Sequence, residues 1–167
     1  KLTAMTSKWL LFLDPPIHAE LRVLVAKVWN SFDMSAEISK IVDGVLADLE
    51  TRNEADIVND FAVAIPSKLI CRILGFPMED YGRLRNWTLY FNRVLEPFES
   101  IHKLKIYNQK AEEFYDYLEI EIAKKMKTPE DDFISKLISS NQELDKPLSL
   151  SDLISIISVM FFAGIET

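Results

Sequence analysis

The sequence has few of the residues that specify disulfide-stapled, metal-centred or sheet-rich folds. Its 167 residues include one cysteine, two histidines and four glycines. A single cysteine, Cys71, excludes an intrachain disulfide and a multi-cysteine metal site, and it favours a reducing compartment. Little alternation of apolar and polar residues accompanies the scarcity of glycine, which argues against β-structure. We therefore expect an all-α, cytoplasmic chain with no metal ligands of its own.

Positive charge is also scarce, with 19 lysines and arginines against 26 acidic residues and a net charge of −7. Nucleic acids and anionic membrane surfaces are bound through lysine and arginine, so neither is an expected partner. A membrane span needs about 20 apolar residues, and the sequence has no such run. The apolar run at residues 9–13 is too short for a signal peptide. The first residue is Lys1, so we expect residues 1–167 to form a single partial domain cut from a longer protein.

The segment that begins at Ser149 predicts a buried central helix. Ser149 and Asp152 have the spacing of a capping box, in which each satisfies a backbone N–H of the other. The helix body that follows has almost no polar face, which is typical of a helix inside a fold. Its apolar residues are Leu153, Ile154, Ile156, Ile157, Val159, Met160, Phe161 and Phe162.

The end of this helix changes character. Ala163 and Gly164 are small and permit close approach of another group. Glu166 and Thr167 then place an acid beside a hydroxyl. A buried carboxylate is costly without a partner, so such an acid usually has a partner or a function. The same residues also fit a helix that simply emerges into solvent.

A second candidate site lies in the helix expected over residues 14–29. Asp14 is the expected N-cap, with Pro15 at the first helical position. His18 and Arg22 are four residues apart, so their side chains share a face about 6 Å apart. Two such donors suit an anionic ligand. The alternative is a surface histidine and an arginine that pairs with Glu20 or with solvent.

Helical spacing predicts the remaining elements after an irregular lead-in at residues 1–13. Helices are expected over residues 36–50 with Ser35 as the cap, and over 78–95 and 99–127. Another is expected over 56–74, kinked at Pro66 and stopped by Gly75. Cys71 lies among apolar residues and is expected to pack in the core. The aromatic residues over 78–127 fit either a core or a substrate-facing surface.

Two motifs together resemble the cytochromes P450. Residues 163–167, AGIET, are similar to the (A/G)-G-x-(D/E)-T signature of the I helix in that family. Residues 14–22, DPPIHAELR, resemble the D-P-P-x-H-x-x-L-R pattern at the start of the C helix in bacterial members. Residues 128–138 resemble the H helix of the family. With it, the expected helices follow the family order C, D, E, F, G, H and the first part of I.

The resemblance implies a haem cofactor and a monooxygenase reaction. By the match, His18 and Arg22 would hydrogen-bond the haem propionates, while Ala163 and Gly164 would open a groove over the haem for dioxygen. Glu166 and Thr167 would relay protons as dioxygen is activated. The implied partners are a small organic substrate and a ferredoxin- or flavodoxin-type redox protein.

Half of the family pattern is absent from these residues. There is no E-x-x-R of the K helix and no glycine-rich loop carrying the cysteine ligand, and Cys71 is not in that motif. The resemblance thus implies a segment of a haem-thiolate monooxygenase that is inactive and without natively ligated haem when alone. The alternative is a non-catalytic helical interaction domain, or a truncated P450-like protein without haem. A chain ending at Thr167 would expose its apolar last helix, which predicts self-association.

Overall fold

The computed structural model describes residues 2–91 and 100–166, apart from the side chains of Ala4 and Glu166. Over these residues it contains helices and no strand, as expected. Three short elements, η1 (Leu10–Phe12), η2 (Ile57–Ala62, a π-helical segment) and η3 (Met78–Asp80), interrupt the longer helices. The α-helices are α1 (Leu2–Thr6), α2 (Ile17–Trp29), α3 (Met34–Glu50), α4 (Ala64–Leu74), α5 (Tyr81–Phe91), α6 (Ile101–Lys127), α7 (Phe133–Gln142) and α8 (Leu150–Glu166).

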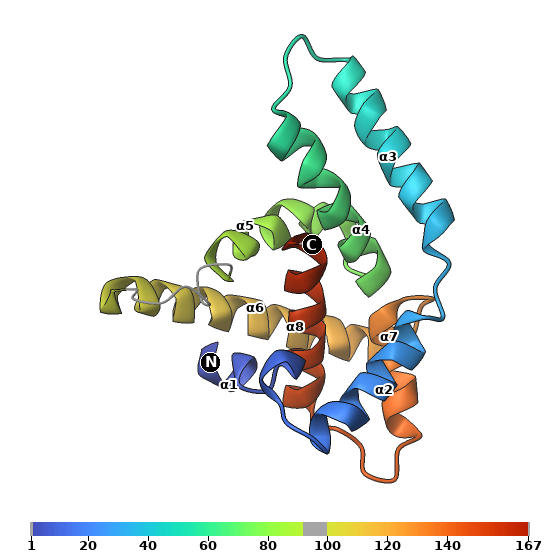
Figure 1. Cartoon of the computed structure of the whole chain (residues 1–167), viewed down its shortest axis with the longest axis vertical. Helices are drawn as coiled ribbons and strands as arrows, with labels where there is room; N and C mark the ends of the chain where they lie inside the picture. Colours follow the sequence, from blue (N-terminus) through green and yellow to red (C-terminus); the bar gives the residue numbers. More distant parts are fainter. Residues whose placement is uncertain (1, 92–99, 167) are drawn as a thin grey trace.

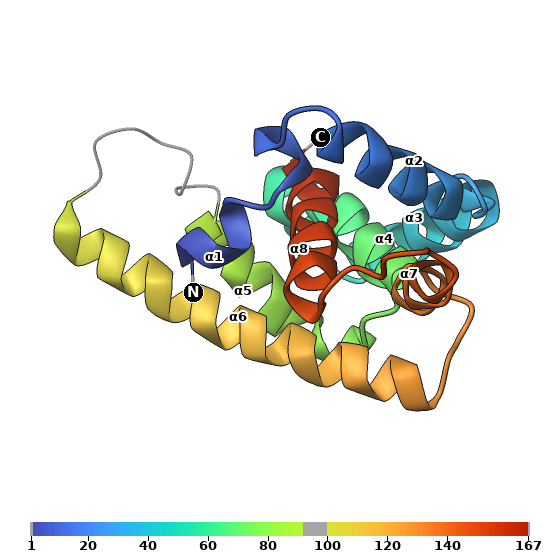
Figure 2. The same ribbon diagram turned by 90° about the horizontal axis from the view of Figure 1, so that it is seen from below.

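Helix α8 is the centre of the molecule. It runs between α6 on one side and α2 on the other (Figures 1 and 2), and it packs on α1, α4, α6 and α7. The predicted capping box is present: the Ser149 N–H donates to Asp152 Oδ2 at 3.0 Å, and the Asp152 N–H donates to Ser149 Oγ at 3.3 Å. Leu153, Ile154, Ile156 and Ile157 are all buried. The prediction of a buried central helix is therefore confirmed.

The polar residues of α8 bind the N-terminal segment, which is not the irregular lead-in that the sequence suggested. Ser155 Oγ donates to the carbonyl of Met5 at 3.0 Å, and the Trp9 indole N–H donates to Ser158 Oγ at 2.8 Å. Lys8 Nζ lies 2.7 Å from Asp152 Oδ1. Periodicity could not reveal α1, because it is a five-residue helix that is held by contacts far away in the sequence.

Helix α2 begins two residues later than expected. The peptide bond between Pro15 and Pro16 is cis, and the first residue of the helix is Ile17. The Asp14 side chain makes no capping hydrogen bond; its backbone carbonyl instead accepts the His18 N–H at 3.1 Å. The prediction of Asp14 as a side-chain cap was therefore wrong, although the helix extends to Trp29 as expected.

Helix α3 differs from expectation in its cap and in its burial. Asp33 is the N-cap and accepts the Ser35 N–H at 3.0 Å, so Ser35 is not the cap. Apolar residues recur at helical spacing along residues 36–50, which predicts an inward-facing stripe. Only Val45 of this stripe is buried, whereas Ile38 is 39% exposed and Leu46 is 42% exposed. The reason is visible in Figure 1, where α3 stands at the edge of the molecule; it packs mainly on α4 and η2.

The single kinked helix expected over residues 56–74 is instead two elements, η2 and α4, and Pro66 lies near the boundary between them. η2 is capped by Asp56, and α4 starts at Ala64, so Pro66 lies in the first turn of α4, where a missing N–H is tolerated. Gly75 ends α4 with φ +89° and donates its N–H to the Cys71 carbonyl at 3.0 Å. A left-handed φ strongly favours glycine.

Aromatic side chains fill the contact between α5, α6 and α8. The Trp87 and Phe114 ring centroids are 5.1 Å apart, and Phe91 stacks on Phe162 at 4.2 Å. These four side chains are buried, so the aromatic residues of α5 and α6 that make these contacts belong to the core. Phe161 and Phe162 are 0% and 6% exposed, which contradicts the premise that they would be left uncovered within this chain. None of the described helices has the length and apolar character needed to cross a membrane.

Candidate functional site

The small residues near the end of α8 occupy different environments. Ala163 is exposed, whereas Gly164 lies against Ile70 of α4. A Cβ added to Gly164 would come within 2.7 Å of Ile70 Cδ1 and 2.8 Å of its Cγ1. This contact gives residue 164 a reason to be small that comes from helix packing. Its role toward a cofactor is still a prediction.

The acid and hydroxyl predicted as catalytic are at the limit of the structure. Glu166 is the last residue of α8, and the structure describes its backbone but not its side chain. Thr167 also lies outside them. The geometry of this pair therefore comes from the sequence spacing alone, and both roles are taken up below as proposals.

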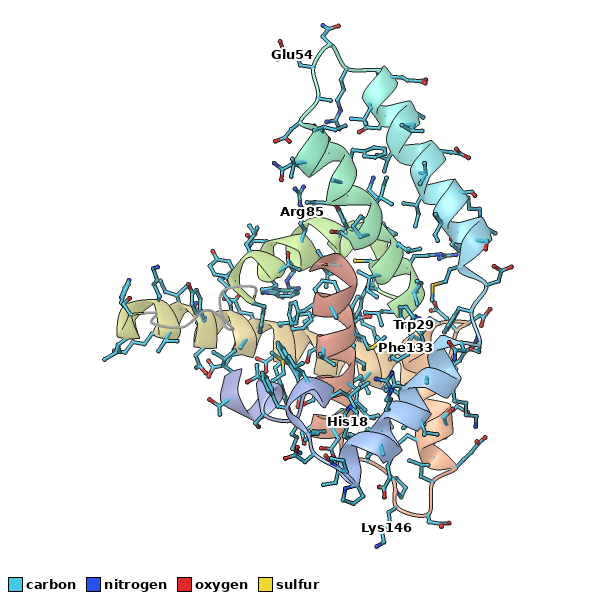
Figure 3. All side chains as sticks on the ribbon, viewed as in Figure 1. His18, Trp29, Glu54, Arg85, Phe133 and Lys146 are labelled. Atoms are coloured by element: carbon cyan, nitrogen blue, oxygen red, sulfur yellow. The ribbon has the colours of Figure 1, made fainter. Side chains whose placement is uncertain are left out.

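His18 and Arg22 lie beside the buried stripe of α2, which also includes Val25. Leu21, Leu24 and Val28 on the same helix are buried, while His18 is half-buried and Arg22 is exposed. Figure 3 shows His18 at the start of this helix. Within the described ranges neither side chain forms an ion pair or a hydrogen bond, so the alternative pairing of Arg22 with Glu20 is not seen. Two neighbouring donors are thus free for an external acceptor.

The two motifs lie in different parts of the molecule. α2 packs mainly on α7, whereas Ala163 and Gly164 belong to the C-terminal end of α8, where Gly164 lies against Ile70 of α4. No hydrogen bond or ion pair among the described residues joins them.

Cys71 is a core residue, as predicted. It is 1% exposed, and burial raises the pKa of its thiol to about 12, so it is protonated at neutral pH. Because a metal binds the thiolate, this residue is unsuited to act as an iron ligand. In the part of the chain that the structure describes, no group of three or more histidine, cysteine, aspartate or glutamate side chains is arranged so that it could hold a metal ion.

A cleft of about 1020 Å³ that sequence reasoning missed lies where the ends of α4 and α6 meet the start of α7. Its buried charges are all paired. The buried Lys125 Nζ is 2.7 Å from the buried Asp132 Oδ2 and 2.9 Å from the exposed Glu130 Oε2. The buried Glu121 Oε1 is 2.6 Å from the exposed Lys124 Nζ. The only sequence signal was an excess of charge at helix ends. The cleft contains none of the predicted site residues, and its geometry serves to join helices.

Known proteins with a related sequence cover nearly the whole chain. No family model matches it. It is 32% identical over 164 residues to the polyketide biosynthesis cytochrome P450 PksS of Bacillus subtilis strain 168, covering 96% of this chain and 39% of that protein. The solved structure of PksS superposes with a TM-score of 0.80 at 31% identity, covering 97% of this chain and 41% of that one.

A second solved structure agrees. P450BioI, in complex with an acyl carrier protein ligated to hexadec-9Z-enoic acid, has a TM-score of 0.86 at 25% identity and covers 99% of this chain and 43% of its own. The chain spans about two fifths of the length of these relatives. It is thus a helical part of the bacterial cytochrome P450 fold, in which α2 to α7 correspond to helices C to H and α8 to the first part of helix I.

Proposed function

We propose that this chain forms the propionate-binding and proton-delivering part of a haem-thiolate monooxygenase. Such an enzyme inserts one atom of dioxygen into an organic substrate and reduces the other to water, using two electrons and two protons. The observation that carries the proposal is the His18 and Arg22 pair, two adjacent donors on one face of α2 that no other described residue uses. Bacterial cytochromes P450 as relatives support the same reaction class.

The residues of this chain fit one end of a haem and not its iron. Two adjacent donors on α2 suit two carboxylates, and charge-assisted hydrogen bonds of this kind are roughly twice as strong as neutral ones. His18 and Arg22 would therefore hold the propionates. Cys71 is buried and protonated, so we expect the thiolate to come from the part of the P450 fold that this chain does not span.

The end of α8 would serve the proton steps. When bound, haem supplies the activation of dioxygen. Ala163 is a small side chain on an exposed face of α8, and position 167 is one helical turn further along the sequence. We propose that Ala163 leaves room beside the cofactor, with Gly164 allowing α8 to lie close to α4. The Glu166 carboxylate would hold a proton and the Thr167 hydroxyl a hydrogen-bonded water.

The proposed substrate is a small organic molecule, and the proposed electron donor is a ferredoxin- or flavodoxin-type protein. The names of the relatives, a polyketide biosynthesis P450 and a P450 bound to an acyl-carrier-linked fatty acid, support an apolar substrate. The aromatic residues of α5 and α6 that form the core are buried against α8, so we do not expect them to contact the substrate.

A test of the proton-delivery role is Thr167→Ala in the intact P450 that contains this chain. Substrate affinity should be nearly unchanged, because the hydroxyl acts after dioxygen has bound. Electron consumption should become uncoupled from product, with release of hydrogen peroxide. The measurement is product and peroxide formed per NAD(P)H consumed in a reconstituted assay. Coupling equal to that of the unaltered enzyme would show that Thr167 has no part in proton delivery.

The second candidate, a helical domain without haem chemistry, is favoured by one observation: the only cysteine is buried and protonated. For residues 1–167 alone, we expect added haem to show no thiolate-type spectrum in the reduced carbon monoxide complex. A thiolate-type spectrum that disappears on Cys71→Ser would contradict this. If the intact protein also lacks that spectrum, the non-catalytic function is the correct one.

A further inference from the structure

Polar side chains recur at helical spacing along one face of α8. Asp152, Ser155 and Ser158 are three residues apart in turn, and the residues between them are apolar. Both serines are 0% exposed. A buried hydroxyl carries a free-energy penalty unless it has a hydrogen-bond partner. This polar stripe therefore requires a partner that runs along α8.

The N-terminal segment, residues 2–13, is that partner. The three residues of the polar stripe bind, in order, the Lys8 ammonium, the Met5 carbonyl and the Trp9 indole N–H. Figures 1 and 2 both show the segment beside α8. Because the contacts lie on successive turns of the helix, they fix the position of the segment along α8.

Trp9 is the residue of the segment that extends furthest toward the C-terminal end of α8. It is 3% exposed, and its indole N–H donates to Ser158 Oγ at 2.8 Å. Its ring centroid is 5.9 Å from that of Phe162, the residue that precedes Ala163. The same ring stacks on Phe12 with centroids 6.3 Å apart and planes 6° from parallel. One indole thus contacts both α8 and the chain that leads to α2.

The segment continues directly into the helix that holds the two donors. η1, which ends at Phe12, packs on α2, and the Asp14 carbonyl accepts the His18 N–H at 3.1 Å. The first turn of α2 is therefore connected to α8 through Trp9, although no hydrogen bond among the described residues joins His18 or Arg22 to α8 directly.

We propose that Trp9, through its hydrogen bond to Ser158, is a positioning residue that sets the place of the α2 donors relative to the C-terminal end of α8. The inference rests on the function proposed above, in which one haem needs His18 and Arg22 on one side and proton delivery from the end of α8 on the other. An error of about 1 Å in such a placement can lower a rate by about 100-fold. Trp9 acts through these residues and takes no part in the reaction itself.

Trp9→Phe in the intact P450 that contains this chain tests the proposal, because it keeps an aromatic ring beside Phe12 and Phe162 and removes the N–H. Peroxide released per NAD(P)H consumed should rise severalfold. Transfer of haem to a scavenging protein should also become faster, which is a readout independent of turnover. A role in folding alone would lower the stability to urea and leave both values unchanged. An unchanged value of either would overturn the proposal.

Ser158→Ala removes the same hydrogen bond from its other side. It should produce the same two changes, and the double variant should be no more affected than the worse single variant, because residues that share one interaction are not additive. Additive effects would mean that Trp9 and Ser158 act independently, which would contradict the proposal.

Two further variants complete the experiment. Trp29→Phe is the matched control, since this indole of α2 packs on Phe133 of α7 with ring centroids 6.1 Å apart, and both readouts should equal those of the unaltered enzyme. Thr167→Ala separates this inference from the function on which it rests. If Thr167→Ala leaves coupling unchanged, the proposed function fails. If Thr167→Ala uncouples the enzyme and Trp9→Phe does not, only the positioning role of Trp9 is wrong.

Discussion

Single residues decide how closely the helices approach one another, and Gly164 is the clearest case. It is the point on α8 where Ile70 of α4 comes closest, and two of the three atoms nearest to an added Cβ lie under 3.0 Å from it. Sequence reasoning correctly singled out residue 164 as a site of close approach. The motif suggested that the group beside Gly164 is a cofactor, whereas the structure shows Ile70 of α4 there. A glycine in a motif indicates close packing without showing which group packs against it.

Replacing Gly164 with valine should destabilise the protein by about 1–3 kcal/mol, because the added methyl groups overlap Ile70. Ile70→Ala in the same protein should recover part of this loss. Gly44→Ala in α3 is the control: nothing lies within 4 Å of its added Cβ, so it should stabilise by up to about 1 kcal/mol through helix propensity. Urea denaturation measures both. If Gly164→Val is as stable as the unaltered protein, α8 and α4 are not packed this closely.

Whole elements are joined at their ends by buried charge. The last turn of α6 contributes Lys125, which contacts Asp132 at the start of α7, and Asp132 also caps α7 by accepting the Ser135 N–H at 2.7 Å. Asp132 also fills the space beside Gly75, where an added Cβ would lie 2.3 Å from its Cγ. Three helix termini therefore meet at one carboxylate.

Asp132→Ala should cost about 3 kcal/mol or more, since it leaves the Lys125 ammonium buried with Glu130 as its remaining partner. The adjacent Asp131 provides a matched control. Its side chain is 87% exposed and pairs with Lys136, so Asp131→Ala should cost less than about 1 kcal/mol. Thermal or urea unfolding of the two variants should separate them clearly. Equal losses would mean that the Asp132 junction contributes no more than a surface ion pair.

The contact between the N-terminal segment and α8 should depend on pH. Burial tends to raise the pKa of Asp152, but hydrogen bonds from Lys8 and Ser149 outweigh this effect. The net result is a pKa below the usual value of 3.8. A carboxyl whose pKa is lower in the folded state stabilises the fold above its unfolded pKa, and the contribution is lost as pH falls through the folded pKa. Stability should therefore decline on acidification below about pH 4.

Lys8→Met tests this dependence. The variant should be less stable at neutral pH and should lose less stability on acidification, because Asp152 then has a more ordinary pKa. Lys40→Met, which removes an exposed lysine that is 3.5 Å from Glu37, should leave the acid decline unchanged. Urea titrations at a series of pH values measure the slope. An identical acid decline in Lys8→Met and the unaltered protein would rule out the assigned role of Lys8.

Elements set by local chemistry could be read from the sequence, and those set by distant contacts could not. The capping box at Ser149 and the stop at Gly75 depend on residues a few positions apart, and both were predicted. The N-terminal helix α1 was missed, because it depends on distant contacts. Met5 and Trp9 form hydrogen bonds with Ser155 and Ser158, which are about 150 positions away in the sequence. The outward face of α3 was also missed, because an apolar stripe indicates a buried face without showing what covers it.

At the scale of the whole molecule, the described helices are arranged around α8, and the proposed site residues belong to α2 and to the C-terminal end of α8. The aromatic core that joins α5, α6 and α8 is complete within these residues, so Phe161 and Phe162 offer no surface for self-association. Exposed apolar residues occur on several elements, among them Val23 of α2, Leu89 of α5 and Ile101 of α6. Sequence spacing alone identified the donor pair on α2, and the structure adds that no described residue uses it.

Retention of haem by the Arg22→Ala variant of the intact P450 that contains this chain tests the central claim most directly. Arg22→Ala should weaken haem binding by about 1.5–3 kcal/mol, the contribution of one charge-assisted hydrogen bond. Lys27→Ala on the same helix, where Lys27 is 3.7 Å from Glu143 on the surface, is the matched control and should retain haem normally. The measurement is the rate of haem transfer to an excess of a haem-scavenging protein. Faster loss from Arg22→Ala alone is the predicted result, and equal rates for the two variants would contradict the assignment of α2 as the propionate-binding helix.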